Sequence, residues 1–188
     1  MNRLGSSVRV RIVRDAMARP SSSSVMTHDL TSPMGFFRDL RLQWAPPRRL
    51  DADFGELTFI FIPNAPARSY WEAEWTFPPT GTKVSIALDG DEAGPSQGAR
   101  EFFLAIPARF PGLIETVRPA LDQVFLRWYG RPLARDPWQD LTLAGFGLES
   151  VDADGASWDV SFEATGEKWL GIRVPIRGER VLEAEVDT

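Results

Sequence analysis

The sequence contains no cysteine and only one histidine, His28, and both shortages narrow the chemistry open to the protein. Without cysteine there is no disulfide, no thiolate ligand for a metal and no cysteine nucleophile. A Ser-His-Asp triad or a multi-histidine metal site would have to be built around His28 alone. His28 lies beside a serine-rich stretch, and we assign it no catalytic role. The lack of cysteine suits a reducing compartment, so we expect a cytoplasmic protein.

Long apolar runs are missing as well. No stretch approaches the roughly 20 apolar residues that a membrane-spanning helix needs, so we expect no membrane partner. The chain has 188 residues, of which 43% are apolar and 25% charged, a composition typical of a globular domain. One domain with a sizeable core is the expectation for this length.

The net charge of −5 hides an uneven distribution of charge along the chain. Residues 1–49 hold nine arginines and three aspartates, a balance of +6. Residues 50–188 hold twelve basic and twenty-three acidic side chains, a balance of −11. An acidic folded part repels nucleic acid and favours a basic protein partner.

The first 35 residues are predicted to be a disordered basic extension, and residues 36–188 a single domain. The extension is rich in arginine and serine, as organellar transit peptides are. Pro20 and the four serines after it are typical of a flexible link. Met26 and Met34 are alternative start positions, so it stays open whether residues 1–33 belong to the natural protein.

Three strands are predicted in the first half of the domain, after a partly ordered stretch over residues 36–50. In that stretch Phe37, Leu40 and Trp44 fall at helical spacing, and Pro46-Pro47 stops any helix. The strands are expected within 55–64, 69–77 and 83–91, with a Pro-Pro-Thr-Gly turn at 78–81. In the third, Val84, Ile86 and Leu88 alternate with Lys83, Ser85 and Ala87.

Two helices are predicted next. The first begins near Ser96, a suitable N-cap, and ends before Pro107. The second runs from Pro111 to Gly130 with a kink at Pro119. Its apolar face is formed by Leu113, Val117, Leu121, Val124 and Trp128.

Four strands are predicted in the last third, within 140–152, 157–165, 169–176 and 180–186. Turn-forming residues at 152–156 and 177–179 indicate two hairpins. The element order predicts an α+β domain, in which an antiparallel sheet is covered on one face by the helical pair.

Glu72 and Glu74 are the candidate catalytic pair. In "SYWEAEWTF" they alternate with Trp71, Ala73 and Trp75, so two carboxylates project from one face of a strand about 6–7 Å apart. Paired carboxylates of glycosidases have a similar separation. A catalytic acid also needs burial, which raises its pKa. Because the tryptophans should occupy the buried side, the solvated face of a strand is the favoured interpretation.

Acidic residues beside glycines suggest cation binding at two places. Asp89, Asp91 and Glu92 form the candidate cation site, and Asp152 to Gly155 resembles it. Both lack the full EF-hand spacing, so acidic surface turns are the favoured interpretation. Gly145-Phe-Gly147 is no dinucleotide fingerprint, and a β-bulge or a close backbone approach is expected there. We expect no cofactor.

The seven tryptophans are expected to serve mainly in the core. Tryptophan is also enriched at binding hot spots. Trp44, beside Pro46, and Trp138, in "RDPWQDL", are therefore the candidate partner-binding residues.

The stretches "DADFGELTF", "YWEAEWTF" and "KVSIALDGDE", followed by a helical region ending in "WYG", make residues 51–186 resemble a loose group of bacterial domains of unknown function. These share an Asp-x-x-Phe-Gly-x-Leu strand opening, and some are immunity proteins of bacterial toxin systems. The resemblance implies a small cytoplasmic protein that acts by binding, and it transfers no catalytic residue.

The leading hypothesis is therefore a non-enzymatic binding domain with an acidic surface and a basic protein partner. One alternative is a carboxylate-dependent enzyme, such as a hydrolase using Glu72 and Glu74. Another is a subunit that self-associates through a sheet edge or a helix face. The sequence leaves the oligomeric state open.

Overall fold

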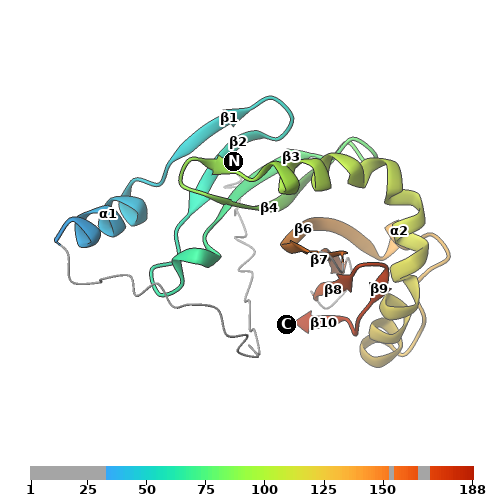
Figure 1. Ribbon diagram of the computed structural model, residues 1–188. Coiled ribbons are helices and arrows are strands. Elements are labelled where there is room, and N and C mark those ends of the chain that lie inside the picture. The colour runs from blue at the N-terminus through green and yellow to red at the C-terminus, as the bar shows by residue number, and fades with distance from the viewer. Residues whose placement is uncertain (1–32, 153–154, 165–169) are drawn as a thin grey trace, which may run out of the picture.

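The computed structural model describes residues 33–152, 155–164 and 170–188, which contain two α-helices and one ten-stranded sheet (Figure 1). Residues 1–32, including His28, lie outside the described residues, as does Trp169. The elements are, in order, α1 (Pro33–Trp44), β1 (Arg48–Asp51), β2 (Gly55–Ile60), β3 (Tyr70–Thr76), β4 (Lys83–Asp91), β5 (Gly94–Pro95), α2 (Gln97–Tyr129), β6 (Leu141–Asp152), β7 (Gly155–Ala164), β8 (Gly171–Arg177), β9 (Arg180–Val181) and β10 (Glu185–Asp187). Two single-turn 3-10 helices, η1 (Pro66–Arg68) and η2 (Pro137–Gln139), lie in the connections.

The strands pair in the order β1-β2-β3-β4-β6-β7-β8-β10, with β5 beside β4 and β9 beside β8. Every pair is antiparallel except β4–β6, which is parallel. The parallel pair follows from α2, because a long crossover helix lets β6 run in the same direction as β4. The predicted α+β class is confirmed, as are the β2-β3-β4 meander and the hairpins β6–β7 and β8–β9.

One prediction was wrong: the helical pair is a single helix, α2, of 33 residues. Pro107, Pro111 and Pro119 all lie inside it. An interior proline removes one backbone hydrogen bond and costs about 3 kcal/mol, which usually ends a helix. Here ten buried side chains along α2 offset that cost, and the helix bends along its length as it crosses the sheet (Figure 1).

Both ends of α2 are capped as predicted. The Ser96 hydroxyl accepts a hydrogen bond from the Ala99 amide at 3.1 Å. At the other end Gly130 adopts the left-handed conformation (φ 69°), and its N–H donates to the carbonyl of Leu126.

Replacing Ser96 by alanine is expected to cost about 1 kcal/mol of folding free energy, because the Ala99 amide loses its acceptor. Urea denaturation of the full chain measures this. A Ser96→Asp variant retains a capping oxygen and should stay within a few tenths of a kcal/mol of the wild type.

The hydrophobic core lies between α2 and one face of the sheet. As the period of two predicts, Trp71, Ala73 and Trp75 of β3 are buried on this face, and Phe77 follows them. Two expectations need correction. Ala87 of β4 is buried although it points to the opposite face, and Trp128 of α2 is partly exposed rather than part of the core.

The turn between β1 and β2, which sequence patterns missed, accounts for the Asp-x-x-Phe-Gly-x-Leu stretch. The Asp51 carboxylate accepts the amides of Asp53 (3.0 Å) and Phe54 (3.2 Å), and Arg100 of α2 pairs with both aspartates. Burial raises the pKa of Asp51, but these amides and Arg100 lower it more, so the net shift is downward. Phe54 and Leu57 of this stretch are buried in the core. The stretch therefore serves folding in this chain.

Gly145 and Gly147 lie in the centre of β6, and the expected close backbone approach is confirmed. A Cβ at Gly145 would lie 2.3 Å from the carbonyl oxygen of Ser85 on the parallel strand β4. A Cβ at Gly147 would lie 2.6 Å from a carboxylate oxygen of Asp159 on β7. The β6–β7 register also shifts between Leu143 and Gly145, as a β-bulge does.

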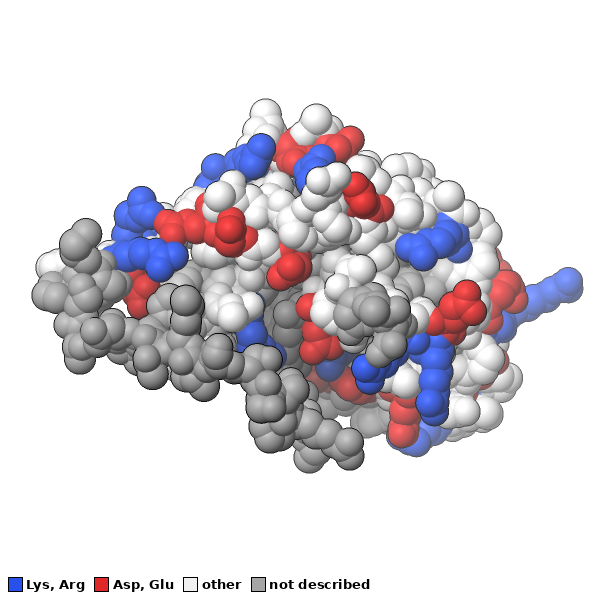
Figure 2. Space-filling view, viewed as in Figure 1, with Lys and Arg blue, Asp and Glu red and all other residues white. Residues whose placement is uncertain are grey.

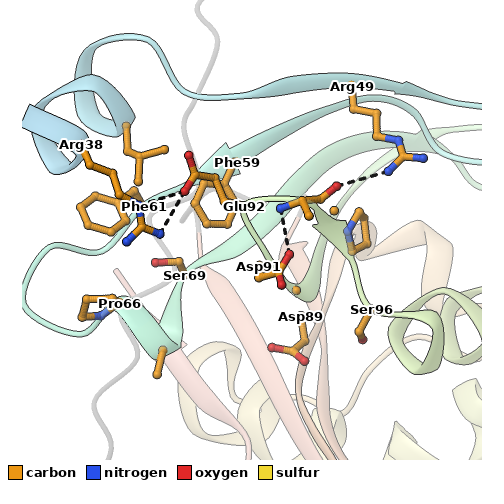
Figure 3. Close-up of a pocket in the computed structure, with 16 residues that line it drawn as sticks. Arg38, Arg49, Phe59, Phe61, Pro66, Ser69, Asp89, Asp91, Glu92 and Ser96 are labelled. Carbon is orange, nitrogen blue, oxygen red and sulfur yellow. Dashed lines mark hydrogen bonds and ion pairs between the residues drawn. The ribbon is translucent and has the colours of Figure 1, made fainter. Parts of the chain in front are cut away.

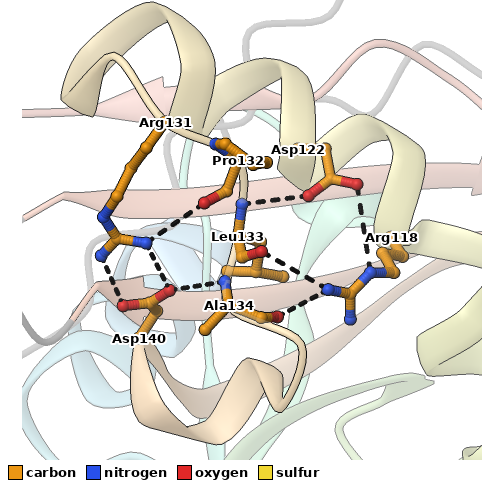
Figure 4. Close-up of polar contacts among 7 residues, drawn as sticks. All are labelled: Arg118, Asp122, Arg131, Pro132, Leu133, Ala134 and Asp140. Carbon is orange, nitrogen blue, oxygen red and sulfur yellow. Dashed lines mark hydrogen bonds and ion pairs between the residues drawn. The ribbon is translucent and has the colours of Figure 1, made fainter.

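Partly buried polar contacts tie the end of α2 to the loop before β6 (Figure 4). Arg131 donates two hydrogen bonds to Asp140, at 2.9 and 2.7 Å, and the Ala134 amide donates to the same carboxylate at 2.8 Å. Asp122 of α2 accepts the Leu133 amide at 3.0 Å. This network, which we call the α2 clasp, fixes the loop that leads into the sheet.

Candidate functional site

A pocket of about 640 Å³ opens at one end of the sheet, between α1, β1, η1 and the β4–β5 hairpin (Figure 3). Residues from five separate parts of the chain line it: Arg38, Leu42, Arg49, Phe59, Phe61, Pro66, Ala67, Ser69, Asp89, Gly90, Asp91, Glu92, Ala93, Gly94, Pro95 and Ser96. This volume lies within the range of ordinary small-molecule sites, about 300–1,000 Å³.

One wall of the pocket is apolar and aromatic. Leu42 and Phe59 belong to the core, and Phe61 packs against it beside Pro66. The Phe59 ring lies 5.3 Å from the ring of Trp71. The Trp71 indole N–H donates to the backbone carbonyl of Asp91 at 2.7 Å, which fixes the end of β4 against this wall.

A second wall is formed by α1, which is held by ion pairs. The Arg38 Nε donates to Glu92 at 3.0 Å, and Arg41 pairs with the same carboxylate. Arg49 of β1 reaches the carbonyl of Ala93 at 3.5 Å. Glu92 thus joins α1 to the β4–β5 hairpin, and its charge is neutralised by two arginines.

The three candidate cation ligands have different roles in this pocket. Glu92 is occupied by Arg38 and Arg41, and the Asp91 carboxylate accepts the Ala93 amide at 2.8 Å within its own turn. The Asp89 carboxylate has no hydrogen bond or ion pair with any described residue, although its backbone carbonyl accepts the Ser96 amide. Within 33–152, 155–164 and 170–188, no three acidic or histidine side chains are placed to hold a metal ion.

Glu72 and Glu74, the candidate catalytic pair, lie outside the pocket. They point to the face of the sheet opposite α2, which we call the second face. Glu74 pairs with Lys83 at 3.2 Å, and their side chains are 74% and 69% exposed. A solvated, ion-paired carboxylate lacks the burial that a catalytic acid requires.

Strand register places many charged side chains on the second face. The acidic ones described in these strands are Glu56, Glu72, Glu74, Asp89, Asp91, Asp159, Glu163, Glu185 and Asp187, and the basic ones are Arg48, Lys83, Arg173, Arg177 and Arg180. Burial lowers the pKa of Arg173, but the hydrogen bond to Glu185 and the nearby charges of Asp159 and Asp187 raise it more. Acidic side chains in the described strands thus outnumber basic ones on this face, nine to five.

Basic side chains are prominent elsewhere. In Figure 2 one group of blue side chains lies over α1 and β1, the elements that carry Arg38, Arg41, Arg48 and Arg49, with acidic side chains beside them. Two of these arginines are paired with Glu92 and one with Glu56. The positive balance of residues 1–49 is therefore partly compensated where the structure describes it.

Both candidate partner-binding tryptophans are at the surface. Trp44 ends α1 and is 83% exposed. At 100° per residue it lies within about 60° of Phe37 and Leu40, roughly opposite the buried Leu42, so this stripe faces away from the domain. Trp138 is 41% exposed and stacks on Phe110 at 5.9 Å. Neither tryptophan lines the pocket.

No family model, curated protein or solved structure matches this chain. None of the helices in the described residues is long and apolar enough to cross a membrane. The pocket was missed from sequence because its residues are spread from Arg38 to Ser96. The one local signal was the acidic turn at 89–92, which marks its rim.

Proposed function

We propose that the protein is a binding domain whose acidic surface engages a basic protein partner. The observation that carries this proposal is the excess of carboxylates on the second face, where nine acidic side chains of the described strands outnumber five basic ones. It agrees with the balance of −11 over residues 50–188. A toxin recognised by its immunity protein is one such partner, as the sequence resemblance implies.

Opposite charges across an interface speed association and set specificity, and their effect is screened by salt. The second face suits this role because Glu56, Glu74 and Asp187 are all exposed. Glu74 and Glu56 make only exposed ion pairs, with Lys83 and Arg48, and such pairs contribute about 0–1 kcal/mol each. These acids are therefore available to a partner at little cost in stability.

Capture from a lysate of the source organism tests the proposal. The bait is the full chain, and the comparison is a Glu56→Lys, Glu74→Lys, Asp187→Lys variant, whose circular dichroism should match that of the wild type. We expect a stoichiometric basic protein that the wild type retains and the variant loses. Equal retention by both baits would contradict the proposal.

The outward stripe of α1 favours a second candidate function, weak self-association. Trp44 and Leu40 expose apolar surface on a helix of 12 residues. Such a helix offers much less than the roughly 800 Å² per partner of a stable interface, so only weak dimers are expected. Sedimentation equilibrium should then show a concentration-dependent dimer that a Trp44→Ser variant weakens. A strictly monomeric wild type at high concentration would remove this candidate.

A further inference from the structure

We propose that the pocket at the end of the sheet binds a cationic side chain, lysine or arginine, supplied by the basic partner. This inference rests on the proposed function and assigns to it a specific binding site. The aliphatic part of such a side chain would lie along Phe59, Phe61 and Pro66, and its charged end would pair with Asp89.

The charges around the pocket favour a cation. Among the residues that line the pocket, the carboxylates of Asp89, Asp91 and Glu92 outnumber the guanidinium groups of Arg38 and Arg49 by one. Glu92 is shared between Arg38 and Arg41, and Arg41 does not line the pocket. Asp91 keeps its charge while binding the Ala93 amide. Asp89 is exposed, and its carboxylate has no hydrogen bond or ion pair with another described residue. The carboxylate that remains available at the pocket is thus Asp89.

The shape and chemistry of the opposite wall fit the rest of a basic side chain. Lysine and arginine bury their methylene groups along apolar surface while the charged end stays polar. Aromatic faces also attract cations, with energies of about 0.5–1 kcal/mol at exposed sites. Phe61, which is only partly buried, provides such a face in the same pocket as Asp89 (Figure 3). An anionic side chain would instead be repelled by the Asp89 carboxylate.

The rim of the pocket is fixed before any partner binds. The Trp71 indole holds the Asp91 carbonyl, and the Asp89 carbonyl accepts the Ser96 amide at 2.8 Å. The next residue, Gln97, begins α2, so the strand that carries Asp89 is tied to the start of the long helix. A pre-formed site loses less conformational entropy on binding than one that must first be ordered.

The test is a titration of ¹⁵N-labelled full chain with three capped tripeptides, Gly-Lys-Gly, Gly-Arg-Gly and Gly-norleucine-Gly. We expect the lysine or arginine peptide to shift the amide signals of residues 59–61 and 89–96. The uncharged norleucine peptide should bind at least about tenfold more weakly, because it lacks the charge-assisted bond to Asp89. Shifts confined to other residues, or equal binding of norleucine, would overturn the inference.

Two variants test separately whether binding depends on the charge of the pocket and on its free volume. Asp89→Asn preserves size, has no described partner to lose, and should weaken the cationic peptide about tenfold. Ala67→Trp, at an exposed position on the rim, should block the pocket without changing charge. Glu179→Gln, in the β8–β9 turn, is the matched control and should bind as the wild type does. Unchanged binding by Asp89→Asn would contradict the inference.

The outcomes distinguish this inference from the proposed function. The Glu56, Glu74 and Asp187 variant leaves the pocket intact, whereas Asp89→Asn leaves the rest of the second face intact. If a basic partner is lost with the triple variant but binds Asp89→Asn fully, the pocket assignment is wrong and the binding domain stands. If the cationic peptides bind the pocket but no basic protein depends on the second face, only the proposed function fails.

Discussion

Replacing Gly145 by alanine is expected to destabilise the protein by about 3 kcal/mol. The added Cβ would lie 2.3 Å from the carbonyl oxygen of Ser85, closer than any real contact allows. The obstructing atom is backbone in the parallel strand β4, so no side chain can rotate to make room. The β4–β6 pair, which joins the two halves of the sheet, would have to separate.

Guanidinium denaturation of the full chain measures this effect, and Gly112→Ala is the matched control. Gly112 lies inside α2, and a Cβ there meets no atom within 4 Å. The control should gain roughly 0.5–1 kcal/mol, because glycine in a helix interior is less stable than alanine by that amount. Equal stability of the Gly145→Ala variant and the wild type would show that β4 and β6 are not paired as described.

Replacing Asp140 by alanine is expected to cost about 2 kcal/mol, because the α2 clasp loses its central acceptor. Asp140 is buried, and its carboxylate accepts two hydrogen bonds from Arg131 and one from the Ala134 amide. Arg131 is 51% exposed and can turn to water, so the cost stays below the 3–5 kcal/mol of a fully buried pair. Differential scanning calorimetry measures the loss.

The same carboxylate makes the stability of the protein depend on pH. The hydrogen bond from Arg131 and the Ala134 amide hold the pKa of Asp140 below its ordinary value, against the opposing effect of burial. Its contribution to stability is therefore complete above the unfolded pKa of about 3.9, and it is lost as the pH falls through the folded value.

The difference in unfolding free energy between the wild type and Asp140→Asn should be constant from neutral pH to about pH 5 and shrink below about pH 4. Urea titrations at a series of pH values measure it. Asp136→Asn, which changes an exposed capping aspartate of η2, is the control for general acid effects. A difference that grows as the pH falls would contradict the assignment of the clasp.

Local features of the fold were predictable from sequence because each depends on neighbouring residues. The alternation of Trp71, Ala73 and Trp75 needs only the pleat of one strand. The caps at Ser96 and Gly130 need only the first and last turns of α2. The close approach at Gly145 was indicated by glycines within an apolar strand, although the atom that it approaches lies on β4.

Features that depend on distant residues were not predictable. The prolines of α2 predict a break in the helix. The free-energy cost of these prolines is offset by packing against a sheet that is assembled from both halves of the chain. Strand β1, Arg-Arg-Leu-Asp, lacks the β-branched and aromatic residues typical of strands. It pairs with β2, and Asp51 at its end also pairs with Arg100, 49 residues away. The pocket likewise depends on Arg38 and Glu92, 54 residues apart. Periodicity carries no information about such contacts.

For the candidate site residues too, local features were predictable from sequence and contacts between distant residues were not. The exposed position of Glu74 and the surface positions of Trp44 and Trp138 followed from strand parity and local context. The acidic turn at 89–92 was noticed for its composition, but its role could not be assigned. Only the structure shows that arginines from α1 neutralise Glu92 and that Asp89 lies beside an aromatic wall.

The most direct test of the central claim is the affinity of the captured partner for the full chain as a function of salt, measured by surface plasmon resonance. An acidic surface that binds a basic protein predicts a 1:1 complex that weakens steeply with added salt, because the Debye length falls to about 3 Å at 1 M. The triple lysine variant should lose most of this affinity. An affinity that is indifferent to both salt and charge reversal would contradict the claim.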